Sequence, residues 1–223
     1  MQRKEPLATG NIYHVMSKSI AGYSIFNSNA EYARMIQMFR FFSYGDNLPR
    51  FSQFITYPIV KKEGFEQALK QLVNENNKLM QIIAYCLMPT HIHLILKQLQ
   101  DNGLSVAMGN MLNAYTRYFN TKHKRQGPLW TSRFKNVLVN SDEQLLHLSR
   151  YIHLNPVTAG LVDNATQWKN SSYAEYVTSD KISYPLCDFR SYIDETPARY
   201  REFVDDRAGY QRELAKIKKL AME

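Results

Sequence analysis

The chain has 223 residues, of which 44% are hydrophobic and 13% aromatic, so it can bury one sizeable core and is not a disordered chain. Its formal net charge of +8 favours a polyanionic partner. Two distant cysteines, Cys86 and Cys187, exclude a disulfide scaffold and fit a reducing compartment. Residues 1–6 lack the apolar stretch of a signal peptide and no run approaches a membrane span, so we expect a cytoplasmic protein.

The first half of the chain alternates between the periodicities of strands and helices. In chain order it predicts a strand over 11–19, a helix over 29–44, an irregular segment with Gly and Pro over 45–64, a short helix over 65–76, and strands over 79–88 and 91–98 joined at Pro89-Thr90.

The second half adds a helix over 104–119, a basic loop over 122–125 and a strand over 133–139. Ser141 and Gln144 have the spacing of a capping box and predict a helix start at 142. That helix should end at 154, because Asn155 precedes a proline and is biased away from helical backbone. A charged helix is predicted over 199–221.

This order predicts an α+β fold with a ferredoxin-like split β-α-β antiparallel sheet, an added helix over 142–154 and a C-terminal helical extension. We expect one core over residues 1–176, with an irregular and helical insertion at about 45–78, and an extension over 177–223.

His91 and His93 lie in an apolar strand and are one residue apart, so both imidazoles should project from the same side. Two imidazoles on a rigid strand provide two ligands of a divalent-metal site. The alternative is a pair of hydrogen-bonded histidines on the polar face of a half-buried strand, because short motifs also occur by chance.

Tyr151 and Asn155 share one stripe of the predicted helix 142–154, at i, i+4 spacing. The amide oxygen of Asn155 is a hard ligand that suits Mg²⁺ or Mn²⁺ more than zinc. Alternatively, Asn155 only ends the helix and Tyr151 only packs on its apolar side. Three further histidines, His123, His147 and His153, are expected to be solvated surface residues.

A helix placed beside the histidine strand would therefore present a phenol and an amide to one metal ion. A phenol is a poor nucleophile at neutral pH, so it needs proton removal and a polarised electrophile. A divalent ion on a phosphate oxygen offsets developing charge and orients a phosphodiester for in-line attack. The residues thus favour a metal-assisted tyrosine nucleophile that forms a phosphotyrosine intermediate.

No acidic residue occurs between Asn102 and Ser141. Cations there alternate with aromatic residues, a pattern typical of single-strand nucleic-acid binding, although most charged runs are only solvated loops. The residues expected to contact nucleic acid are Arg117, Lys122, Lys124, Arg125, Trp130, Arg133 and Lys135.

Several motifs in this order resemble the HUH single-tyrosine transposases, and among them the REP-associated tyrosine transposases. They cover roughly residues 8–176 and comprise 88–94 (MPTHIHL), 129–134 (LWTSRF), 150–162 (RYIHLNPVTAGLV), and Trp168 followed by Ser171-Ser172-Tyr173.

The resemblance implies a ferredoxin-like nuclease that cleaves and rejoins single-stranded DNA at hairpin-bearing repeats, leaving a 5′-phosphotyrosine and a free 3′-hydroxyl. It assigns His91 and His93 as metal ligands, Tyr151 as the nucleophile, and Asn155 as a third ligand where related insertion-sequence transposases have Gln. The segment over 45–64 and the helix after it are longer than the family pattern, and the extension beyond about 176 carries no family motif.

Two other interpretations remain open. A ferredoxin-like fold also serves non-catalytic proteins that hold single-stranded DNA or RNA. A metal-dependent hydrolase of small phosphate compounds could use the histidine pair to activate water, although the acid-free aromatic segment argues against it. Metal-dependent covalent capture of DNA distinguishes the transferase from both.

Overall fold

The computed structural model describes residues 6–45 and 48–207, and its centre is a four-stranded antiparallel sheet. The strands are β1 (Ile12–Lys18), β2 (Met80–Met88), β3 (His91–Gln98) and β4 (Lys135–Leu138), in the order β2-β3-β1-β4. Strands β2 and β3 form a hairpin, and β1 lies between β3 and β4. With a helix after β1 and another after β3, this is the predicted ferredoxin-like arrangement, and the fold prediction is confirmed.

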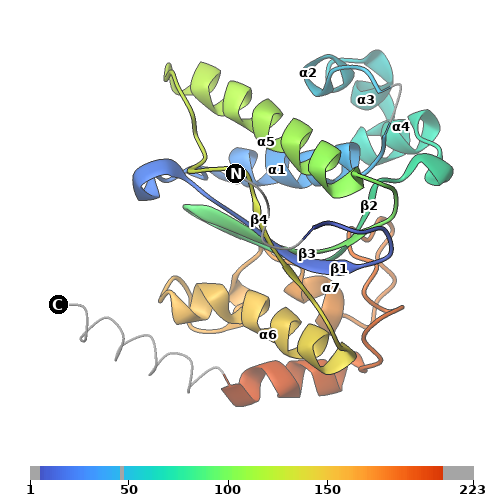
Figure 1. The fold of residues 1–223 in the computed structure, drawn as a ribbon, viewed down its shortest axis with the longest axis vertical. Helices are drawn as coiled ribbons and strands as arrows, with labels where there is room; N and C mark the ends of the chain where they lie inside the picture. Colours follow the sequence, from blue (N-terminus) through green and yellow to red (C-terminus); the bar gives the residue numbers. More distant parts are fainter. Residues whose placement is uncertain (1–5, 46–47, 208–223) are drawn as a thin grey trace.

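Helices cover both faces of the sheet (Figure 1). On one side lie α1 (Asn29–Phe42) and α5 (Gly103–Lys122); on the other lie α6 (Asp142–Thr158) and α7 (Tyr173–Val177). Alternation along the strands sends Val15, Ile92 and Leu94 toward α1 and α5, where all three are fully buried. The histidines of β3 therefore face the layer that contains α6.

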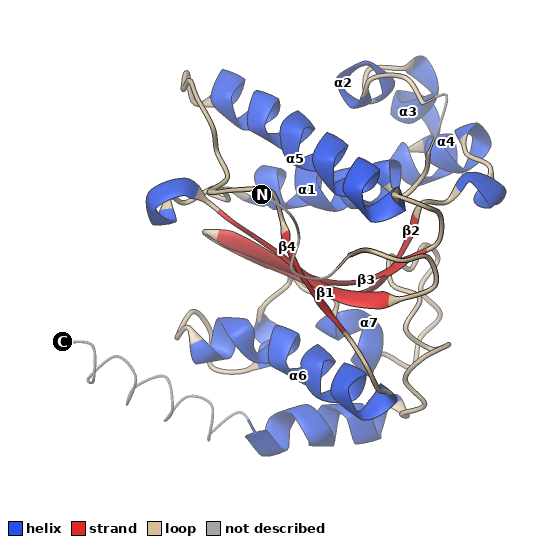
Figure 2. Cartoon of the chain, in the orientation of Figure 1, coloured by secondary structure: helices blue, strands red, loops and turns tan. Residues whose placement is uncertain are grey.

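The segment over 45–64, predicted to be irregular, contains two short helices, and this prediction is wrong for residues 51–63. They are α2 (Phe51–Phe54) and α3 (Pro58–Glu63), followed by α4 (Phe65–Leu72), as Figure 2 shows. Phe51 and Phe54 pack on Phe41 of α1, with ring centroids 5.2 and 5.3 Å away. Contact with the core stabilises helices that are too short to form on local propensity alone.

Helix α6 begins as predicted. The Oγ of Ser141 accepts a hydrogen bond from the backbone N–H of Gln144 at 3.1 Å. The side-chain Oε1 of Gln144 accepts one from the backbone N–H of Asn140 at 2.7 Å. Two backbone donors at the helix start are thus satisfied reciprocally, and the predicted cap is confirmed.

The predicted end of this helix at Leu154 is wrong, because α6 continues through Pro156 to Thr158. Proline has no N–H, so the carbonyl of Ile152 loses its usual partner four residues later. The Nδ2 of Asn155 donates to that carbonyl instead, at 3.5 Å. Asn155 therefore remains on the helix, in line with Tyr151.

The residues after α6 pair with the outer edge of β2. Backbone N–H groups of Leu87, Ser172 and Asp188 donate to the carbonyls of Asn170, Tyr85 and Ile82, at 2.9, 2.9 and 2.8 Å. Residues beyond 176 also bury Cys187, Phe189 and Tyr200 in the same core. Residues 197–207 are helical; the predicted continuation over 208–221 lies outside the described residues.

Within the described ranges, none of the helices combines the length and apolar character needed to cross a bilayer.

Candidate active site

Three imidazoles lie together on the α6 side of the sheet. His91 and His93 of β3 are 5.0 Å apart between ring centroids. His14 of β1 joins them, because Met16 pairs with His93 and residues two apart on a strand share a face. The rings of His14 and His93 are stacked with centroids 5.3 Å apart. The sequence pattern had pointed to His91 and His93 only; His14 was missed.

Each histidine of β3 has one ring nitrogen engaged by a neighbour. Nδ1 of His91 lies 2.9 Å from Oγ1 of Thr90. Nδ1 of His93 lies 3.1 Å from Nε2 of His14. Histidines that bind metals are usually held through the nitrogen that does not bind the metal. The arrangement leaves Nε2 of His91 and of His93 for another partner.

All three rings are kept neutral by their surroundings. Burial lowers the pKa of His14 to about 4. It lowers the pKa of His93 to about 3, with smaller contributions from His14 and His91. The pKa of His91 is also lowered, first by burial and then by the charge of Lys18. Neutral imidazoles have a lone pair to donate, which is the state in which histidine binds metal ions.

Tyr151 on α6 projects toward this cluster. Its ring lies edge-on to those of His93 and His14, with centroid distances of 5.9 and 6.3 Å. The residue is 43% exposed, so a large substrate can approach it from solvent. By contrast, Tyr115 is fully buried and its hydroxyl donates to the backbone carbonyl of Ile25, so it is not an alternative nucleophile.

Asn155 lies one turn after Tyr151 and is partly buried. Its amide nitrogen contacts the Ile152 carbonyl, and its Oδ1 is the atom that could bind a cation. Within residues 6–45 and 48–207, no group of three or more His, Cys, Asp or Glu side chains is placed to hold a metal ion. A metal bound by His91 and His93 therefore needs a third ligand of another type, and an amide oxygen meets that need.

Two lysines flank the cluster on the same face. Lys18 is paired with His91 across β1 and β3, and Lys135 is paired with Met16 across β1 and β4. Both are exposed. No local sequence pattern indicates Lys18, because its proximity to His91 depends on the pairing of strands far apart in the chain.

Two of the other residues expected to contact nucleic acid are engaged by partners within the protein. Lys122 forms an ion pair with the buried carboxylate of Glu31 at 2.8 Å, and Arg125 donates to Asn120 and to the carbonyl of Pro128. These two cations stabilise the chain at the C-terminal end of α5. Arg117 and Lys124 are exposed on that helix and on the loop after it.

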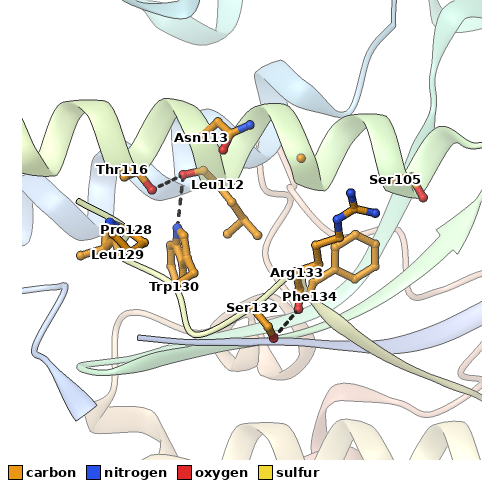
Figure 3. Close-up of a pocket in the computed structure, with 11 residues that line it drawn as sticks. Ser105, Leu112, Asn113, Thr116, Pro128, Leu129, Trp130, Ser132, Arg133 and Phe134 are labelled. Carbon is orange, nitrogen blue, oxygen red and sulfur yellow. Dashed lines mark hydrogen bonds between the residues drawn. The ribbon is translucent and has the colours of Figure 1, made fainter. Parts of the chain in front are cut away.

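Trp130 and Arg133 line a pocket of about 530 Å³ between α5 and residues 128–134 (Figure 3). The indole N–H of Trp130 donates to the carbonyl of Leu112 at 3.2 Å, and its ring lies 6.2 Å from that of Tyr115. Trp130 thus packs partly against the core, and Arg133 lies on the α5 side of the sheet.

His153 is not a solvated surface residue, and that expectation is wrong. His153 is completely buried, with Nδ1 2.8 Å from the hydroxyl of Tyr200 and Nε2 2.7 Å from Oγ of Ser172. The residues after 176 cover it, which the local pattern does not reveal. His123 is exposed, as expected, and its Nε2 also lies 2.6 Å from the carboxylate of Glu31. His147 is half exposed, as expected.

The chain is similar to known proteins in sequence and in fold. Residues 55–155 match the family described as transposase IS200 like. A Haemophilus influenzae protein named as a REP-associated tyrosine transposase is 26% identical in an alignment of length 110 that covers 45% of this chain and 62% of that protein. The aligned region thus spans less than two thirds of the relative.

A solved structure, described as a REP-associated tyrosine transposase bound to a REP hairpin, has the same fold. Its TM-score is 0.51 at 12% identity, over 84% of this chain and 97% of that one. In its motifs, in the sequence of residues 55–155 and in its fold, the chain is similar to the REP-associated tyrosine transposases and the IS200-like family.

Proposed function

We propose that the chain is a DNA strand transferase that cleaves and rejoins single-stranded DNA through a covalent bond to Tyr151. The observation that carries this proposal is the position of Tyr151, whose exposed ring lies 5.9 Å from that of His93 in the histidine pair. A phenol beside two neutral imidazoles with free Nε2 atoms combines a nucleophile with a metal site.

The relatives support a particular kind of substrate. One similar protein is named as a REP-associated tyrosine transposase, and the structural neighbour is described as bound to a REP hairpin. We infer that this chain acts on single-stranded DNA that carries a hairpin, in the manner of DNA transposition. Its net charge of +8 is consistent with a polyanionic substrate.

The reaction follows from the placement of the phenol. The phenol of Tyr151 gives up its proton to solvent as Oη attacks the phosphorus of a phosphodiester, the new Oη–P bond forms, and the P–O3′ bond breaks. The leaving oxygen takes a proton and becomes a free 3′-hydroxyl, while the 5′-phosphate stays on the tyrosine. Attack on that phosphotyrosine by a 3′-hydroxyl reverses the step, rejoins a strand and regenerates the phenol.

The donor set fits a hard divalent cation, Mg²⁺ or Mn²⁺. His91 and His93 would hold it through Nε2, and Asn155 through Oδ1. When bound, such an ion supplies positive charge to a phosphate oxygen and offsets the charge that develops during attack. The protein keeps both rings neutral and oriented, so that they are ready to bind without first losing a proton.

Exposed cations would hold the strand. Lys18 and Lys135 flank the histidines, and we assign them to the phosphates next to the cleaved bond. Arg117, Lys124 and Arg133 lie farther along the α5 side and would contact the DNA beyond the site. These contacts position the DNA without reading its sequence.

We further propose that the nuclease core spans residues up to about 176, with an insertion at about 45–78, and that the extension supports α6. Tyr200 of the extension contacts both His153 and Ser149 of that helix, at 2.8 Å each. This contact ties the helix that carries Tyr151 to the extension.

Covalent capture tests the proposed function. The full chain is incubated with 5′- and 3′-labelled hairpin oligonucleotides and Mn²⁺ or Mg²⁺, then denatured and separated by size. We expect a denaturation-resistant adduct that carries the label located 3′ of the cut, and no adduct with a chelator. Single-strand binding without an adduct would indicate a binding protein. Metal-dependent phosphate hydrolysis without single-strand affinity would indicate a small-molecule hydrolase.

A further inference from the structure

His14 is a polar residue in an otherwise well-buried strand, and nothing in the proposed reaction uses it directly. Only 9% of the residue is exposed, and its neighbours Tyr13 and Val15 belong to the core on the other face of the sheet. A buried imidazole needs hydrogen-bond partners, because a buried polar group without a partner is destabilising. Nε2 of His14 lies 3.1 Å from Nδ1 of His93.

This contact restricts the proton positions of both rings. An N–H must lie between the two nitrogens for a hydrogen bond to form, and each neutral imidazole carries only one N–H. If the proton is on Nδ1 of His93, then Nε2 of His14 accepts it and Nε2 of His93 keeps its lone pair. The opposite arrangement places a proton on Nε2 of His93 and removes the lone pair that a metal ion would need.

We propose that His14 is the positioning residue of the metal site: its Nε2 accepts the Nδ1–H of His93 and thereby presents the lone pair of His93 at Nε2. This inference rests on the proposed function, in which His93 binds a divalent cation. Thr90 has the equivalent position for His91, since its Oγ1 lies 2.9 Å from Nδ1 of that ring. Both ligands of β3 are then held through Nδ1 in the same way.

His14 is not itself a third metal ligand in this arrangement. Its Nε2 is occupied by His93, and the three histidines do not form a group placed to hold a metal within the described parts of the chain. The stacked rings, 21° from parallel, also fix the rotation of His93 about its side chain. Its role is therefore to set the tautomer and orientation of a ligand.

Two substitutions separate this role from simple packing. In His14→Gln the side-chain oxygen can accept the same hydrogen bond, because it reaches about as far as Nε2. In His14→Leu the bulk is retained and the acceptor is lost. Met16→Leu is the matched control, since Met16 lies on the same strand and face and pairs with His93 without a hydrogen-bonding side chain.

Two measurements are made on each full-length variant, with thermal melting to show that it is folded. The first is Mn²⁺ affinity by calorimetry. We expect His14→Leu to weaken binding by about 10–100-fold, as for other residues that orient metal ligands, and His14→Gln and Met16→Leu to stay near wild type. Equal weakening in the Gln and Leu variants, or no weakening in a folded Leu variant, would overturn the proposal.

The second measurement is independent of the metal and of catalysis. Long-range ¹H–¹⁵N spectra of the metal-free protein report which nitrogen of His93 carries the proton. We expect the Nδ1–H form in wild type and His14→Gln, and a shift toward Nε2–H in His14→Leu. An Nε2–H form in wild type would refute the role of His14. Absence of Mn²⁺ binding by a wild type that shows Nδ1–H would instead contradict the metal site itself.

Discussion

The ring of Tyr151 lies edge-on to that of His93, at an angle of 88° and with 5.9 Å between centroids. Tyr151→Phe should therefore abolish adduct formation while DNA affinity and melting temperature stay nearly unchanged, because only an exposed hydroxyl is lost. Covalent capture, filter binding and thermal melting measure the three quantities. Tyr118→Phe, on α5, is the control and should form the adduct normally. An adduct in Tyr151→Phe would place the nucleophile elsewhere.

The metal dependence of capture should divide the proposed ligands into two classes. His91→Ala or His93→Ala should remove the adduct at every metal concentration, because each deletes one of two imidazoles. Asn155→Ala should retain some adduct but need more Mn²⁺, because water can replace an amide oxygen. Adduct yield is measured against Mn²⁺ concentration, with His147→Ala on the same helix as control. A normal curve for Asn155→Ala would exclude it as a ligand.

The lysines beside the histidines should contribute to the salt dependence of single-strand binding. If Lys18 and Lys135 each touch a phosphate, replacing both with Gln should flatten the slope of log affinity against log salt by about 1.4, or 0.7 per contact. Binding is titrated at several salt concentrations. The control is the replacement of Lys61 and Lys62 of α3, which removes the same charge at positions distant in sequence from Lys18 and Lys135. It should leave the slope unchanged. If the two double variants have equal slopes, the DNA does not run along β1.

Acid should destabilise the fold through His153. Burial lowers its pKa to about 3, so the unfolded chain binds a proton first as the pH falls through about 6.5. The contribution of neutral His153 to the free energy of unfolding is complete above that pH and is lost progressively below it. The loss reaches about 2 kcal/mol at pH 5. In His153→Phe this part of the decline in the free energy of unfolding should be absent.

Urea unfolding at pH 7.5, 6.5 and 5 measures that decline. His14 and His93 also have lowered pKa values, but they are present in both proteins and cancel in the difference. His147→Phe should follow the wild-type curve, since that ring is half exposed. Parallel curves for wild type and His153→Phe would show that the buried imidazole is not the acid-sensitive group.

Local patterns predicted those parts of the fold that depend on neighbours in sequence. The period-two alternation placed His91 and His93 on one face, and the i, i+4 spacing kept Tyr151 and Asn155 in line. The position of His14 depends on β1 lying between β3 and β4 in a specific register, which no local window contains. The burial of His153 depends on residues about 47 positions later in the chain.

The contacts along β2 have a consequence for how much of the chain can be removed. The backbone N–H of Asp188 donates to the carbonyl of Ile82 on the outer edge of β2, while Asn170 and Ser172 pair with Leu87 and Tyr85 farther along that edge. A protein shortened at residue 176 would expose part of that edge, together with the apolar surface now covered by Phe189 and Tyr200. Exposed, apolar strand edges pair readily with one another. The shortened chain would therefore be prone to self-association, although every residue assigned to its chemistry would still be present.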